Sequence, residues 1–109
     1  MELTNILLRD IDTCIKNNDM NGLVDILNLV RLYDINKQIS TGYIFQKSFF
    51  KACKYGNKSI ILWLSNIFDE IDPIEKMSIR QLFKYGKYIV KRHKNGQLDK
   101  WYQETIISR

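Results

Sequence analysis

The chain has little of what most enzymes and metalloproteins need. Its 109 residues include one histidine and two cysteines, and they contain no zinc-ligand spacing, glycine-rich phosphate loop or serine-centred elbow. Two cysteines, Cys14 and Cys53, are too few for a disulfide framework, so we expect reduced, buried thiols. His93 has no acidic partner nearby in the sequence, and we expect it on the surface. We therefore expect a protein that is not an enzyme, with no catalytic residues, no cofactor and no metal.

Long hydrophobic runs are also missing. No apolar stretch approaches the roughly 20 residues needed to cross a bilayer. The first five residues lack the basic region and the small-residue cleavage site of a signal peptide. These two absences predict no membrane span and an intracellular location.

Proline and glycine, which are frequent in turns, are scarce. The sequence has one proline and five glycines, yet 45% of its residues are hydrophobic and 12% are aromatic. Such a chain can fill a core, and its sparse turn signals suit helices better than a sheet. We expect a single all-α domain over residues 1–109 with five or six helices in stacked hairpins.

Apolar residues recur at helical spacing in six segments. We expect helices over about residues 3–17, 22–34 and 43–55, a fourth after Asn57, a fifth starting at Pro73, and a last one over 97–107.

The boundaries of these helices are predicted from turn and cap residues. Asn21 and Asn57 are expected to cap the second and fourth helices, and Gly56 to close the third. Asp72 precedes Pro73 and is expected to cap the fifth helix. Gly86 is expected to bend or end that helix.

The helical hairpin recurs along the chain. Residues 16–24 and 54–62 align at an offset of 38 residues, and both copies read as a helix, a small turn and an apolar helix. The second copy resembles the core of an ankyrin repeat in four residue pairs, Ala52-Cys53, Gly56-Asn57, Ile60-Ile61 and Trp63-Leu64. Generic hairpins in a small helical bundle stay open as the alternative.

The same region is similar to ankyrin-like proteins of large DNA viruses in its aromatic Trp63 and its background rich in Lys, Asn and Ile. This resemblance implies a non-enzymatic protein–protein interaction module, viral and directed at a host factor in the cytoplasm of an infected cell. It names no protein partner and transfers no site residues. Assembly with further copies of the chain stays open, because few repeats make a marginal stack.

Basic residues gather in the last third of the chain. Residues 75–109 hold nine lysines and arginines against three acids, whereas residues 1–74 have a net charge of −1. The candidate binding residues are Lys84, Lys87, Lys91, Arg92 and Lys94. Together with Lys100 they interleave with Tyr85, Tyr88, Trp101 and Tyr102. One interpretation is a nucleic-acid-binding helix in which lysines contact phosphates and rings stack on bases. The other is a solvated helix face whose aromatic rings turn into the core.

Overall fold

The computed structural model describes residues 2–35, 40–68, 78–94 and 96–108. These residues form six α-helices and one π-helical segment, and none of them lies in a strand. In chain order the elements are α1 (Glu2–Lys16), α2 (Met20–Ile35), α3 (Thr41–Tyr55), α4 (Lys58–Ile67), α5 (Ile79–Lys91), α6 (Gly96–Tyr102) and η2 (Gln103–Ile107). The expected all-α class is confirmed for these parts of the chain.

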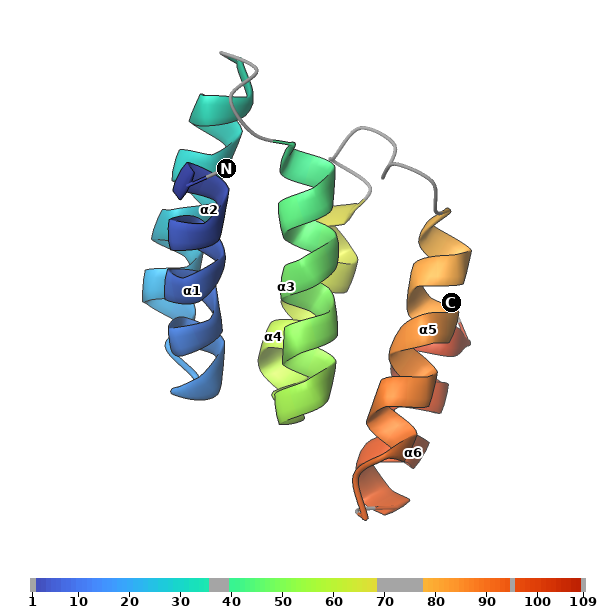
Figure 1. The fold of residues 1–109 in the computed structure, drawn as a ribbon. Helices are drawn as coiled ribbons and strands as arrows, with labels where there is room; N and C mark the ends of the chain where they lie inside the picture. Colours follow the sequence, from blue (N-terminus) through green and yellow to red (C-terminus); the bar gives the residue numbers. More distant parts are fainter. Residues whose placement is uncertain (1, 36–39, 69–77, 95, 109) are drawn as a thin grey trace.

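The helices pair into three hairpins that stand side by side in two layers (Figure 1). One layer consists of α1, α3 and α5, in which α3 contacts both neighbours. The other layer consists of α2, α4 and α6, each packed behind the first helix of its own hairpin. No described helix covers the outward side of α1, α3 and α5, which we call the front face.

The first hairpin turns at residues 17–19. Asn18 takes a positive φ of 55°, and the Asp19 amide donates to the Cys14 carbonyl at 2.7 Å. The Asp19 side chain then accepts a hydrogen bond from the Gly22 amide at 3.0 Å. Asp19 is therefore the residue that caps α2, and the expectation that Asn21 caps it is wrong, because Asn21 already lies inside the helix.

The second hairpin turns where the sequence predicts. Gly56 closes α3 with a φ of 73°, a left-handed conformation that side chains rarely adopt, and its amide donates to the Ala52 carbonyl at 2.9 Å. Asn57 precedes α4, but its side chain makes no cap hydrogen bond there. Its amide nitrogen Nδ2 donates instead to the Ile15 carbonyl at the end of α1, which ties the first hairpin to the second.

The third hairpin begins with a capped helix. α5 starts at Ile79, after a capping box in which Ser78 and Gln81 exchange side-chain and backbone hydrogen bonds at 3.0 and 3.2 Å. The expected start at Asp72 and Pro73 lies outside the described residues. α5 continues through Gly86 to Lys91, so the glycine does not end the helix.

One hydrophobic core runs through all three hairpins. At its centre Phe49 of α3 packs against Phe68 and Phe83, with ring centroids 5.5 and 5.6 Å away. Tyr102 of α6 is fully buried and donates from its hydroxyl to the Phe83 carbonyl at 2.6 Å. This packing is possible because Gly86 has no side chain between the Tyr102 hydroxyl and Phe49.

Candidate functional site

The front face is hollowed between α3 and α5. This α3–α5 groove has a volume of about 390 Å³ and is lined by Lys47, Phe50, Lys51, Lys54, Ile89, Arg92 and His93. The residues from α3 share one side of the helix because they are spaced three or four apart. Ile89 and Arg92 are likewise three apart at the end of α5.

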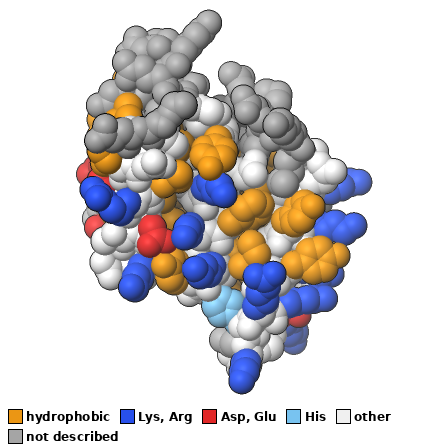
Figure 2. All heavy atoms as spheres, viewed as in Figure 1, with side chains coloured by type: hydrophobic (Ala, Val, Ile, Leu, Met, Phe, Trp, Pro, Cys, Tyr) orange, Lys and Arg blue, Asp and Glu red, His pale blue; other side chains and the backbone are white. Residues whose placement is uncertain are grey.

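The groove has an apolar floor and a basic rim. Phe50 and Ile89 are half-buried and pack against the core. Figure 2 shows apolar side chains over α3 and α5 with lysine and arginine side chains around them, and the single histidine at the edge of this patch. Acidic side chains are few on this face. The surface therefore combines hydrophobic contact area with positive potential.

Most of the rim cations have no acidic partner in the part of the chain that the structure describes. Among the described residues, Lys47, Lys54 and Arg92 form no ion pair. Lys47 lies over the Tyr43 ring and Lys54 over the Tyr55 ring, with the ammonium groups 5.6 and 5.9 Å from the ring centroids. These ring contacts hold the side chains but leave their charges uncompensated.

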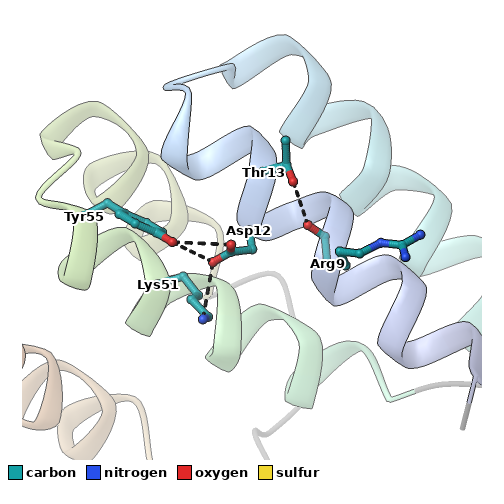
Figure 3. A network of polar contacts seen from close by, with 5 residues as sticks. All are labelled: Arg9, Asp12, Thr13, Lys51 and Tyr55. Carbon is teal, nitrogen blue, oxygen red and sulfur yellow. Dashed lines mark hydrogen bonds and ion pairs between the residues drawn. The ribbon is translucent and has the colours of Figure 1, made fainter.

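Lys51 differs from its neighbours because it is paired. Its ammonium lies 3.3 Å from an Asp12 carboxylate oxygen of α1, and the Tyr55 hydroxyl donates to the same carboxylate at 3.1 Å (Figure 3). Partial burial, and then the nearby Asp12 carboxylate, raise the pKa of the Tyr55 hydroxyl, while Lys51 opposes that rise. The network joins α1 to α3.

A second hollow of similar volume lies between α1 and α3. Its lining includes Leu8, Asp12 and Tyr43, and it shares Lys47 and Lys51 with the α3–α5 groove. The two hollows therefore adjoin, and the front face offers a surface that crosses all three first helices of the hairpins.

His93 is half-buried at the end of the groove rather than fully exposed on the surface. Its Nε2 lies 3.0 Å from the Cys53 carbonyl oxygen. Because a carbonyl only accepts, this hydrogen bond needs the proton on Nε2. The histidine thus joins the end of α5 to the last turn of α3, which is a structural task.

The five basic residues predicted from the sequence do not form one site. Arg92 lines the α3–α5 groove, whereas Lys84 and Lys87 line a hollow between α5 and η2 together with Arg80. Lys91 and Lys94 are exposed and line neither hollow. The predicted set misses the three lysines of α3, although their spacing of four and three residues is visible in the sequence.

The aromatic residues near the basic segment divide between surface and core. Tyr85 and Tyr88 are 55% and 56% exposed, so the interpretation in which these rings turn inward is wrong for both. Tyr102 is buried as that interpretation expects. Trp101 is half-buried, with the Lys58 ammonium 5.8 Å from its ring centroid.

Neither cysteine has the lowered pKa of a reactive thiol. Both cysteines are free, and burial raises the pKa of Cys53 to about 12, which keeps the thiol protonated at neutral pH. Burial, and then the nearby carboxylates of Asp19 and Asp10, also raise the pKa of Cys14. Within the described ranges no cluster of three or more potential metal ligands occurs, and no helix is both long and apolar enough to cross a membrane.

Comparisons with protein-family models, with curated proteins and with solved structures find no match to this chain. The ankyrin resemblance and the viral, host-directed role that it implies therefore stay predictions from the sequence.

Proposed function

We propose that this protein is a non-enzymatic interaction module that binds another protein through its front face. The observation that carries the proposal is the α3–α5 groove. Its half-buried Phe50 and Ile89 form an apolar floor between cations, most of which form no ion pair with a described residue. Protein-binding surfaces combine such an apolar centre with a polar rim. The adjoining hollow between α1 and α3 extends this surface across α1, α3 and α5.

The stacked hairpins support this function in a second way. Three first helices held side by side form a firm, extended surface, and repeat proteins commonly use such surfaces to bind partners. The contacts that fix this layer, such as the Asp12–Lys51 ion pair, lie between helices rather than in loops. The surface is therefore preorganised, which lowers the entropic cost of binding.

A photocrosslinker tests the proposal. Benzoylphenylalanine replaces Lys54 at the groove rim in one variant and Lys100, which is exposed on α6, in another. Each variant is irradiated in nuclease-treated cell lysate. The proposal expects a discrete protein adduct at position 54 and none at position 100. Adducts that are the same at both positions, or none at either, would contradict it.

Nucleic-acid binding is the second candidate, and the exposure of Tyr85 and Tyr88 favours it. Both rings stand beside the basic stripe of Lys84, Lys87 and Lys91, which is the combination that stacks bases and contacts phosphates. This function predicts binding of a labelled single-stranded oligonucleotide that weakens steeply with salt. It also predicts loss of that binding when the three lysines become glutamate.

A further inference from the structure

We infer that the α3–α5 groove receives an acidic amphipathic helix, which carries carboxylates along one flank and a large apolar side chain toward the groove floor. The inference rests on the proposed function and names the chemistry of the partner. It draws on the charge, the spacing and the floor of the groove.

The charge of the groove calls for an acidic partner. Lys47, Lys54 and Arg92 line it without a carboxylate partner among the described residues, so their positive potentials add. Asp12, which lines the adjoining hollow, already pairs with Lys51 at 3.3 Å. Carboxylates of a partner would form ion pairs with the remaining cations, as Asp12 does with Lys51. A basic partner would meet repulsion instead.

The spacing of the cations matches a helix. Lys47, Lys51 and Lys54 stand at positions i, i+4 and i+7 of α3, so they form a row about 10 Å long. Lys51 is already paired with Asp12, so acidic residues seven positions apart on a partner helix would face Lys47 and Lys54 at the two ends of the row. Helices that bind in a groove also place apolar anchors at i, i+3, i+4 and i+7 against its floor.

The floor suits an apolar anchor better than a stacked base. Phe50 is half-buried and held edge-on against Phe49, with ring centroids 6.4 Å apart and planes at 61°. Ile89 faces it from α5 and offers no ring at all. Tyr85 lies one turn before Ile89 on the same flank of α5 and can extend the contact. These side chains would cover a leucine or phenylalanine from the partner.

Peptide selection tests this inference without a known partner. A phage-displayed library of random 16-residue peptides is panned against the full chain, and the enriched peptides are synthesised. We expect net negative sequences that contain at least one large apolar residue and gain helical circular dichroism on binding. Their Kd should rise at least roughly tenfold for K47E/R92E, because each reversal replaces an attraction with a repulsion.

The matched control changes the same charge elsewhere. K58E/K100E reverses two exposed lysines, one on α4 and one on α6 in the other layer, and should leave the Kd within about twofold. Thermal melts of both double variants verify that they fold. All four side chains are exposed.

The other outcomes would contradict the inference, and they show whether the acidic helix or the groove itself is wrong. Enriched peptides that lose binding in K47E/R92E but carry no excess of acidic residues would contradict the acidic helix and leave the proposed function standing. Peptides that bind K47E/R92E unchanged, or a library without enrichment, would contradict the groove as the binding site. Displacement of acidic peptides by a labelled single-stranded oligonucleotide at low concentration would assign the groove to nucleic acid.

Discussion

Gly86 is the position where a single methyl group should damage the fold most clearly. It lies in the middle of α5, where alanine would ordinarily favour the helix by about 1 kcal/mol. A Cβ atom at this position would overlap the Tyr102 hydroxyl, and it would lie 2.8 Å from Phe49 Cε2 and 3.1 Å from Cys53 Sγ. The methyl group therefore meets side chains of α3 and α6 at once.

The cost follows from these contacts. Overpacking a well-filled core costs about 1–3 kcal/mol, and displacing Tyr102 would also weaken its 2.6 Å hydrogen bond to the Phe83 carbonyl, worth about 1 kcal/mol. After the gain in helix propensity, we expect Gly86→Ala to lower the free energy of unfolding by about 2 kcal/mol. For a domain of this size the melting temperature should fall by about 10 °C.

Thermal and urea denaturation followed by circular dichroism measures this change. Gly96→Ala is the control, because a Cβ at Gly96 meets no atom within 4 Å, and its stability should stay the same or rise slightly. Tyr102→Phe removes the nearest overlapping atom, so Gly86→Ala should cost about 1 kcal/mol less in that background. A Gly86→Ala protein as stable as the wild type would refute the packing of α5 against α3 and α6.

Three further predictions concern stability. Burial raises the pKa of Cys53 to about 12, and burial and then contact with Cys53 raise the pKa of Tyr102. Both groups must stay neutral in the fold, so melting temperatures should fall above about pH 9, where the unfolded thiol ionises. A level melting temperature up to pH 10.5 would contradict this burial. Asn57→Ala removes the bond to the Ile15 carbonyl and should cost about 1 kcal/mol in urea denaturation, whereas a neutral result would mean that the turns are not joined. Ser78→Ala removes the capping box of α5 and should cost about 1 kcal/mol by the same assay; no loss would argue for a helix that starts before Ile79.

Local chemistry explains why much of the fold is predictable from the sequence. The turn at Gly56 needs only one residue that tolerates a positive φ, so the end of α3 is identified correctly. The start of α5 is harder, because two capping patterns compete in the sequence. Ser78 and Gln81 match the capping-box spacing as well as Asp72 and Glu75 do, and local propensity does not rank them.

The candidate site is less predictable because residues far apart in the sequence form it. Lys47 and Arg92 are 45 residues apart, and only the packing of α3 against α5 brings them to one groove. The basic residues of the last third are visible in the sequence, but the fold divides them. Arg92 lines the α3–α5 groove, whereas Lys84 lines the hollow between α5 and η2. Gly86 is similar, since its role comes from Tyr102 on another helix rather than from its neighbours in the chain.

The central claim is that the front face binds a protein. The most direct test captures partners from nuclease-treated lysate on three immobilised proteins, the wild type, K47E/R92E and K58E/K100E, and compares the captured proteins by quantitative mass spectrometry. We expect a defined set of captured proteins that the wild type and K58E/K100E retain and that K47E/R92E loses. The same set on all three proteins, or no defined set on the wild type, would contradict it.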